Sequence, residues 1–363
     1  MKLIVQPGDS VIPLIDAINS AKKSLDIAIF RFDRNEIETA LENAARRGLC
    51  VRALIAYTNR GGERSLRNLE MRLLAGGVMV ARTANDLARY HDKFMIVDRH
   101  ELYMLAFNFT YLDIEHSRSF GVAVRDRRLV QEAVKLFEAD TMRQPYLNGM
   151  ATFVVSPVNA RRRLSAFLRG ARKELLIYDP EVSDAAMTRL LEERAAAGVD
   201  VKIIGKLKRR SPRLAVRKLV RLRLHTRTIV RDGESAFIGS QSLRAVELEK
   251  RRELGIIVRD RKVVSQLHAI FTADWNLGEE YGLEEGGTQT APPVTRLAKK
   301  VAKTVARDLP PVAPVVEVIV KEVGPEIEVD TRQVEEAVKQ AVKEAVREAV
   351  QDVVEKVANP QER

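Results

Sequence analysis

The sequence of 363 residues has little cysteine and few aromatic side chains. Its one cysteine, Cys50, excludes an internal disulfide, and we expect it to be a small buried apolar residue. With 5% aromatic, 45% hydrophobic and 31% charged residues, the composition is typical of a soluble globular protein. Collagen-like, disulfide-rich and wholly disordered classes are thereby excluded.

Segments typical of export or membrane insertion are also lacking. The first residues, MKLIVQPGDSVIPLIDAINS, show neither a basic segment before a long apolar run nor a small-residue cleavage site. No stretch approaches the roughly 18 to 20 apolar residues that a membrane span requires. We therefore expect a cytoplasmic protein, and peripheral contact with a membrane stays open.

Positive charge is unevenly spread along the chain. The formal net charge is +11, whereas the segment 283–363 holds 12 cations and 15 acids. The densest cationic run, residues 202–227, has eleven Lys and Arg and no acid. Such a run attracts polyanions, either nucleic acid or an anionic lipid surface, although a well-solvated face is the alternative.

An internal repeat divides the body of the chain into two halves. The matching segments are AKKSLDIAIF with ARKELLIYDP, HDKFMIVD with HTRTIVRD, and SFGVAVRDRRLV with ELGIIVRDRKVV. The second and third pairs share one offset along the chain, and the first pair has a longer one, so a single deletion lies between Gly198 and His225. We place the halves at residues 1–148 and 149–282.

Each half shows alternating strand and helix patterns. In the first, residues 24–30 and 50–56 are short apolar runs, and residues 35–47 between them have apolar positions at helical spacing. Further strands are predicted at 93–98, 101–107 and 120–126, and a closing helix at 128–142. The sequence predicts an α/β protein of two similar halves, each a mixed, mainly parallel sheet covered by helices.

The C-terminal part differs in composition from the body. Residues 283–329 are rich in Glu, Gly, Pro and Val and are predicted to form a linker with a Pro/Val-rich segment. From Asp330, residues 330–363 predict a helical tail in which valines recur at every fourth position. A role in self-association or partner binding through residues 330–357, a solvated tail and weak membrane-surface contact all remain open.

The chemistry-bearing pattern is H-x-K-x-x-x-x-D and its repeated copy. It comprises His91, Lys93 and Asp98 in the first half and His225, Arg227 and Asp232 in the second. In an extended segment each histidine and the cation two positions later face the same side. Histidine can act as nucleophile or general acid near neutral pH, and a neighbouring cation can hold phosphate oxygens.

The duplication gives this pattern its weight. A lone H-x-K occurs by chance in many chains, and His100, His116 and His268 show no such pairing, so we expect these three to be structural. The other two histidines occupy equivalent positions of the repeats. We therefore predict one phosphodiester-handling site built jointly by both halves.

The two motifs resemble the paired HKD motifs of the phospholipase D superfamily, over nearly all of residues 1–282. Members of that superfamily typically continue with G-S-x-N and, later, an acidic residue. The second half keeps Gly239, Ser240 and Glu253 but has Ser242 in place of Asn. The first half keeps Asn108, with Leu105, Ala106 and Ser119 at the other positions.

The resemblance implies a phosphohistidine mechanism that uses no metal or other cofactor. His91 would be the nucleophile, and His225 would protonate the leaving group and then activate the acceptor. Lys93, Arg227 and Asn108 would bind phosphate oxygens with help from Ser240 or Ser242. Glu253 would orient His225, leaving His91 without an equivalent, whereas Asp98 and Asp232 would stabilise the turns after the motif strands.

The resemblance thus implies a phosphodiesterase or phosphatidyltransferase acting on phospholipids, in the manner of cardiolipin synthases and phospholipases D. A metal-independent nuclease of the same superfamily is the alternative, since the basic run suits either polyanion. Because Arg227 stands where Lys is usual and the first Gly-Ser is missing, a non-catalytic phosphate- or nucleic-acid-binding scaffold is the third interpretation.

Overall fold

The structure is a computed structural model that describes residues 1–57, 63–147, 149–209 and 211–280. The chain divides into two units, residues 1–282 and 283–363. The predicted linker at 283–329 and the predicted helical tail at 330–363 lie outside the described residues. The fold below is that of the first unit.

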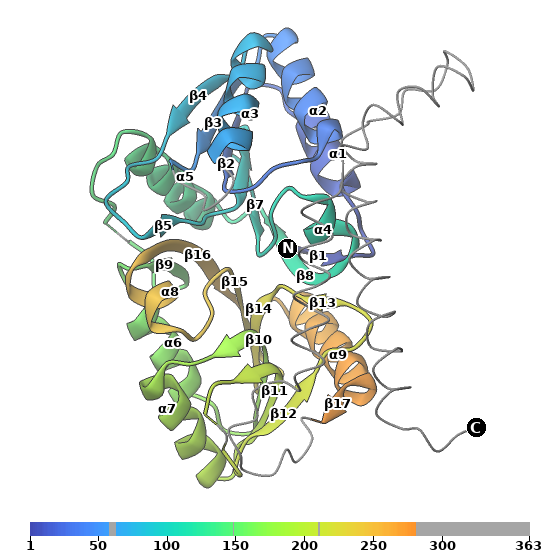
Figure 1. The fold of residues 1–363 in the computed structure, drawn as a ribbon, viewed down its shortest axis with the longest axis vertical. Coiled ribbons are helices and arrows are strands. Elements are labelled where there is room, and N and C mark those ends of the chain that lie inside the picture. The colour runs from blue at the N-terminus through green and yellow to red at the C-terminus, as the bar shows by residue number, and fades with distance from the viewer. Residues whose placement is uncertain (58–62, 148, 210, 281–363) are drawn as a thin grey trace, which may run out of the picture. The chain divides into compact units, whose positions relative to one another are not determined.

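The first half of this unit is one mixed sheet with helices. In chain order its elements are β1 (Lys2–Gln6), α1 (Ile12–Ser20), β2 (Ser24–Ile29), α2 (Asn35–Arg46), β3 (Cys50–Ile55), α3 (Glu63–Ala75), β4 (Met79–Arg82), β5 (Arg89–Tyr90), β6 (Phe94–Val97), β7 (Glu101–Leu105), α4 (Tyr111–Glu115), β8 (Ser117–Val124) and α5 (Arg127–Thr141). The strand order is β1-β8-β7-β6-β2-β3-β4. Figure 1 shows this half uppermost.

The second half repeats the same plan. Its elements are β9 (Phe153–Ser156), α6 (Ala160–Arg169), β10 (Glu174–Val182), α7 (Ala185–Ala196), β11 (Asp200–Leu207), β12 (Ala215–Lys218), β13 (Arg223–Leu224), β14 (Arg227–Arg231), β15 (Ser235–Gly239), α8 (Ala245–Glu249), β16 (Arg251–Val258), α9 (Arg261–Leu277) and β17 (Glu279–Glu280). Its sheet runs β9-β16-β15-β14-β10-β11-β12, the counterpart of the first. The second half passes from β11 to β12 without a counterpart of α3, which accounts for the deletion seen in the repeat.

The predicted α/β fold of two similar halves is confirmed, with one correction. Within each half as the structure describes it, the parallel pairs lie toward one side of the sheet, where β2 pairs with β3 and β3 with β4, and β10 pairs with β11 and β11 with β12. The later strands pair antiparallel with their neighbours: β6 with β2, β7 with β6, and β8 with β7. The sheets are therefore mixed, and the expectation that they are mainly parallel is wrong.

The two halves exchange a short strand just before each motif. Strand β5 of the first half pairs with β16 of the second, and β13 of the second half pairs with β8 of the first. The exchange carries the chain of each half across to the other sheet before it returns to its own. Each motif histidine follows an exchanged strand directly, so both lie where the halves meet.

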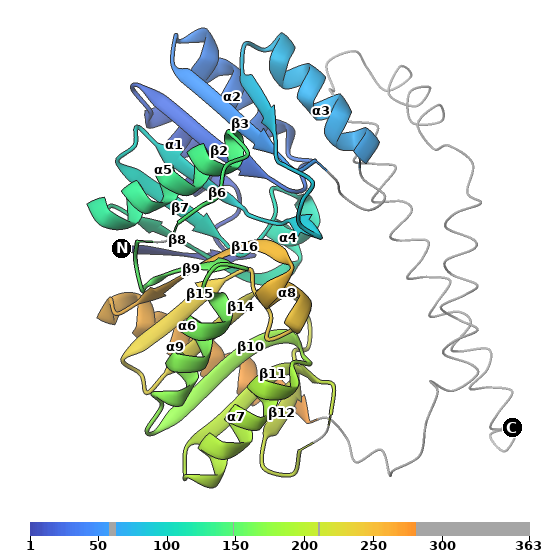
Figure 2. The same ribbon diagram turned by 90° about the vertical axis from the view of Figure 1, so that its left-hand side faces the viewer.

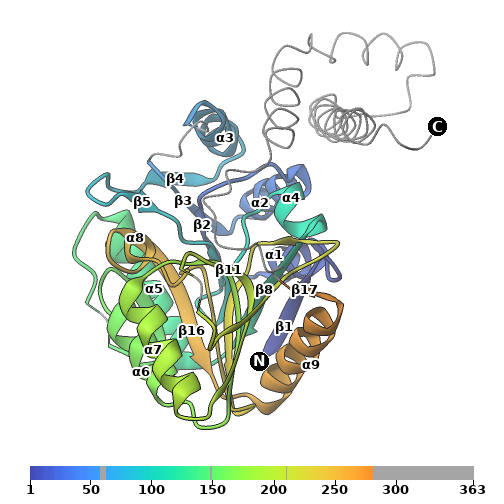
Figure 3. The ribbon, with the colours of Figure 1, turned by 60° about the horizontal axis from the view of Figure 1, so that its bottom comes forward.

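Buried residues form a central core shared by the halves and two outer cores. The central core takes one face of each sheet together with the apolar sides of α5 and α9. Helices α1, α2 and α3 cover the outer face of the first sheet, and α6 and α7 that of the second. Figures 2 and 3 show α6 and α7 on the opposite side of the second sheet from α9. Apolar burial across the shared core joins the halves into one body.

Two bidentate ion pairs reinforce this junction. Arg252 on β16 binds Asp140 on α5, and its counterpart Arg118 on β8 binds Asp274 on α9, with N–O distances of 2.7 to 3.1 Å. Each pair joins one half to the other. The two arginines, like the two aspartates, are separated by the same offset as the motif histidines, so the repeat conserves the junction as well as the motifs.

The motif aspartates fix the turns after their strands, as proposed from the sequence. Both residues have a positive φ, and each accepts backbone hydrogen bonds from three successive amides, 22–24 for Asp98 and 172–174 for Asp232. Burial opposes ionisation of Asp98, yet the three amides together hold its pKa below the usual range. The carboxylates thus tie β6 to β2 and β14 to β10.

Replacement of Asp98 by Ala is expected to lower the free energy of unfolding by about 1 to 3 kcal/mol, since three amides lose a charged acceptor. Because the folded-state pKa is lowered, this stabilisation exists above the unfolded-state pKa and is lost as the pH falls through the folded-state pKa. Urea unfolding at pH 7 and pH 3 measures it. Equal losses at both pH values would contradict this account.

Two smaller expectations concern Cys50 and membrane spans. Cys50 begins β3 and is exposed, so the expectation that it is buried is wrong. Cys50 and its partner Ser24 are the first residues of β3 and β2, and the continuous buried part of both strands begins only after them. Within the described ranges, no helix combines the length and apolar character needed to cross a membrane.

Candidate active site

Backbone contacts across the junction hold both motif histidines in equivalent positions. The His91 amide donates to the Arg252 carbonyl at 2.8 Å, and the His225 amide donates to the Arg118 carbonyl at 3.2 Å. Both residues are buried, with exposed fractions of 7% and 9%. The same arginines form the ion pairs that join the halves. The junction therefore also fixes the backbone position of each motif histidine.

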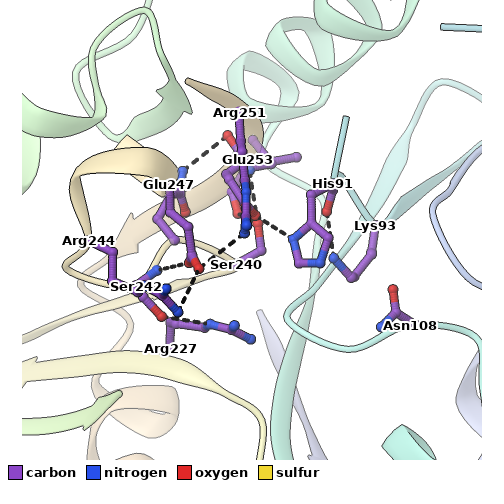
Figure 4. Close-up of polar contacts among 12 residues, drawn as sticks. His91, Lys93, Asn108, Arg227, Ser240, Ser242, Arg244, Glu247, Arg251 and Glu253 are labelled. Carbon is purple, nitrogen blue, oxygen red and sulfur yellow. Dashed lines mark hydrogen bonds and ion pairs between the residues drawn. The ribbon is translucent and has the colours of Figure 1, made fainter. Parts of the chain in front are cut away.

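Glu253 contacts His91, which corrects the expectation that it orients His225. Its Oε2 lies 2.7 Å from His91 Nδ1, and its side chain is fully buried (Figure 4). The strand exchange explains the difference, since β5 brings His91 alongside the strand that carries Glu253. A carboxylate at Nδ1 holds the ring proton there and leaves Nε2 with a free lone pair.

The environment of His91 favours its neutral form. Burial lowers its pKa well below the usual value, and the charges of Lys93 and Arg227 lower it further. The Phe30 ring packs edge-on against the imidazole, with centroids 4.5 Å apart. A neutral, oriented imidazole with a free nitrogen is the form that can attack phosphorus.

The two motif cations bind the backbone of their own histidines. Lys93 Nζ donates to the His91 carbonyl at 2.5 Å, and Arg227 Nη1 donates to the His225 carbonyl at 2.6 Å. Arg227 Nε also donates to Ser242 Oγ at 3.1 Å. Burial lowers the pKa of Lys93 to about 7, opposed by the charge of Glu253. The two halves therefore present cations of different chemistry: one titrates near neutral pH, and the other is a fixed guanidinium.

We expect anion binding at this site to weaken above pH 7, because Lys93 then loses its proton. Affinity for inorganic sulfate, whose charge is constant in this range, should fall by up to about tenfold per pH unit between pH 7 and pH 9. Titration calorimetry in two buffers of different ionisation enthalpy should show proton uptake on binding. The Lys93→Met variant should lack both effects, and a pH-independent affinity in the wild type would contradict the assignment.

His225 has different surroundings from His91. Position 119, the counterpart of Glu253, is a serine, and both Ser119 Oγ and His225 Nδ1 are buried without a hydrogen-bond partner in the structure. Asp113 lies on the other side of the ring, with Oδ2 3.5 Å from Nε2. Burial, followed by the charges of Arg227 and Arg223, lowers the pKa of His225, whereas Asp113 opposes this.

Asn108 and Ser242 occupy equivalent positions after the two motifs, and each donates a hydrogen bond from its backbone amide to a buried carboxylate. The Asn108 amide and Nδ2 both donate to Asp113 Oδ2, at 2.9 and 2.6 Å, and Asn108 Oδ1 is buried without a partner. In the second half the Ser242 amide donates to Glu247 Oε2 at 2.8 Å. Figure 4 shows Asn108 on the Lys93 side of the motif residues.

The incomplete Gly-Ser of the first half has a packing explanation. Gly239 lies opposite Gly255 across the β15–β16 pair, and a Cβ on Gly239 would come within 2.5 Å of the Phe237 ring. In the first half Leu105 faces Gly121, whose missing side chain leaves room for the leucine. Ser240 Oγ exchanges hydrogen bonds with the backbone of Leu254, the residue after Glu253, so it supports the strand that carries the His91 partner.

Charges from both halves act on both histidines. Arg227 and Glu247 of the second half alter the pKa of His91, and Lys93 and Asp113 of the first half alter that of His225. The four motif side chains therefore gather at one place between the sheets. Chemically, this arrangement offers a nucleophilic nitrogen, a second imidazole for proton transfer and two cations for phosphate oxygens.

Several residues of the site were missed in the sequence. Asp113 and Glu247 are equivalent in the repeat, and each stands five positions after Asn108 or its counterpart Ser242, so the repeat contained a signal for them. Phe30 has no such signal because its counterpart is Pro180. Within the part of the chain that the structure describes, no group of three His, Cys, Asp or Glu side chains is arranged to hold a metal ion.

Comparison with known families agrees with this geometry. A family model described as "Cardiolipin synthase, PLD-like domain" matches residues 14–141 and 164–275. The chain belongs to this phospholipase D-like family. Each of the two matched stretches contains one of the motifs.

Individual relatives of this phospholipase D-like chain are distant. It is 27% identical over 130 residues to a mitochondrial cardiolipin hydrolase from Danio rerio, an alignment covering 35% of this chain and 56% of the relative. The chain thus spans about half the length of that curated relative.

Solved structures share the fold. A phosphatidylserine synthase from Haemophilus influenzae aligns with a TM-score of 0.60 at 13% identity, covering 84% of this chain and 93% of the other. A polyphosphate kinase from Porphyromonas gingivalis aligns with a TM-score of 0.64 at 19% identity, covering 76% and 47%. At such identities the alignments show a common fold.

Proposed function

We propose that this phospholipase D-like chain is a phosphodiester hydrolase or phosphatidyltransferase acting on phospholipids. The observation that carries the proposal is the buried imidazole of His91, held at Nδ1 by Glu253, with the motif cations Lys93 and Arg227 acting on it. Burial keeps bulk water away from this group, which strengthens charge interactions with a bound phosphate.

The proposed reaction has two steps. In the first, His91 Nε2 forms a bond to phosphorus while the bond from phosphorus to the leaving oxygen breaks, and His225 gives that oxygen a proton. In the second, water or an alcohol attacks phosphorus, the N–P bond breaks, and His225 takes the proton of the attacking group. Lys93 and Arg227 would hold the non-bridging oxygens throughout.

A phospholipid substrate is supported by the family description and by the similarity to a protein named as a cardiolipin hydrolase. It also fits an exposed cationic arm that begins at the end of β11 and continues beyond it. In the described part of the chain, the arm's cations form no ion pair; they are Lys206, Lys208, Arg209, Arg213 and Arg221. Parallel strands β10 and β11 end at the edge where β14 begins, so the arm leaves the sheet on the histidine side. Anionic headgroups at a membrane surface match that charge.

A metal-independent nuclease is the second candidate, because the same arm suits a nucleic-acid backbone. The run 202–227 contains no aromatic residue, whereas single-stranded nucleic-acid sites usually combine cations with stacking rings. This observation favours the lipid over the nucleic acid.

The deciding experiment incubates the purified full chain with EDTA and either labelled phosphatidylglycerol vesicles or plasmid DNA. We expect headgroup release or transfer from phosphatidylglycerol, and none with the His91→Ala variant. Cleavage of DNA in place of lipid would support the nuclease. Turnover of neither substrate would leave the binding scaffold, and a strict need for a divalent metal would overturn the two-step reaction.

A further inference from the structure

The second histidine lacks the carboxylate that supports the first. Ser119 and Glu253 occupy equivalent positions, since Ser119 pairs with Gln6 across β8–β1 just as Glu253 pairs with Ser156 across β16–β9. A serine hydroxyl carries no charge, and here it forms no hydrogen bond that the structure records. The positive charge of a protonated His225 therefore needs another partner.

Asp113 is placed to be that partner. Its Oδ2 lies 3.5 Å from His225 Nε2, and its exposed fraction is 3%. In the described ranges no other carboxylate lies within ion-pair distance of this ring. Helix α4 carries Asp113, and Thr110 caps that helix through the Asp113 amide.

The carboxylate of Asp113 is held rigidly. Oδ2 accepts hydrogen bonds from the amide and the side chain of Asn108, and Oδ1 pairs with Arg223. These partners keep the carboxylate ionised: burial raises its pKa, but the charges of His225 and Arg223 and the Asn108 hydrogen bonds bring it below the usual value. A fixed negative charge thus faces His225.

The cations around His225 disfavour its protonation. Arg227 on β14, Arg223 on β13 and Lys93 before β6 all lower its pKa, in addition to burial. Asp113 on α4 acts in the opposite direction. Without Asp113, a buried ring among three cations would not retain the proton that a general acid must deliver.

We propose that Asp113 is the positioning residue for His225, substituting from the Nε2 side of the ring for the carboxylate that is missing at Ser119. This inference rests on the proposed function. The protonated ring gives one proton to the leaving oxygen and becomes neutral, then regains a proton from the attacking water or alcohol. Asp113 stays ionised in both steps, and its charge favours the protonated form of the ring.

The test is the titration of His225 by NMR in chains with labelled histidine, the signal being assigned with His225→Asn. Asp113→Asn should lower the pKa of His225 by about one unit or more. Ser119→Glu should raise it, and the double variant Asp113→Asn/Ser119→Glu should restore it. In turnover assays the basic limb of the pH profile should move in the same directions, with kcat at least about tenfold lower in Asp113→Asn.

A matched control separates this role from loop support. Glu247→Gln alters the equivalent loop contact in the second half and should leave the pKa of His225 unchanged. An unchanged His225 pKa in Asp113→Asn, or no recovery in the double variant, would overturn the proposal. Because the titration needs no substrate, it decides this inference even if the wild type turns over no phospholipid, a result that would count against the proposed function alone.

Discussion

Replacement of His91 by Asn should lower phospholipid turnover by roughly 10,000-fold or more, the scale expected when a nucleophile is removed. Asn keeps a polar side chain that can bind Glu253, so the buried carboxylate is not left alone. The chain should therefore fold normally. Initial rates on phosphatidylglycerol vesicles, together with the melting temperature, measure both effects.

Detection of a covalent phosphohistidine intermediate provides a second test of His91 as nucleophile. In the wild type, acid-free quenching during turnover of a phosphorus-labelled substrate should leave label on His91. The His91→Asn chain should carry none. Label at another residue, or turnover within tenfold of the wild type, would contradict the assignment of His91 as nucleophile.

Replacement of Asp140 by Ala should reduce the free energy of unfolding by about 3 to 5 kcal/mol, because it leaves the Arg252 guanidinium buried without its carboxylate. Both side chains are at least nine-tenths buried, at 7% and 3% exposure, and the pair is bidentate. Activity should fall as well, because the Arg252 carbonyl accepts the His91 amide. Denaturant unfolding measures the first effect and turnover the second.

A double variant provides the control for this pair. Asp140→Leu with Arg252→Met replaces the ions by apolar side chains and should recover most of the lost stability, because no buried charge is stranded. If the single and double variants were equally unstable, packing rather than charge would explain the loss. A single variant as stable as the wild type would show that the pair does not hold the junction.

Much of the fold could be predicted from the sequence because the repeat shows the pattern of most elements twice. The segments around β2, α2 and β3 and their copies were recognisable by period and by offset. The antiparallel return of β6, β7 and β8 was missed, since strand direction depends on the turns between strands and not on side-chain period.

The site was predicted less completely than the fold. His91 and His225 stood out because both copies of the motif keep the same spacing. The pairing of Glu253 with His91 could not be predicted, since it depends on the exchange of β5 between sheets, a tertiary feature with no local pattern. Asp113 could not be recognised from the motif for a different reason: it lies in a short helix after the motif, outside the H-x-K-x-x-x-x-D pattern.

The central claim is that the two halves build one active site between them, and comparison of three variants tests it most directly. Turnover is measured, under saturating phosphatidylglycerol, for His91→Asn, for His225→Asn and for the double variant. A joint site predicts that each single variant loses nearly all activity and that the double variant loses little more. Two independent sites would instead leave about half of the activity in each single variant, and that result would contradict the account.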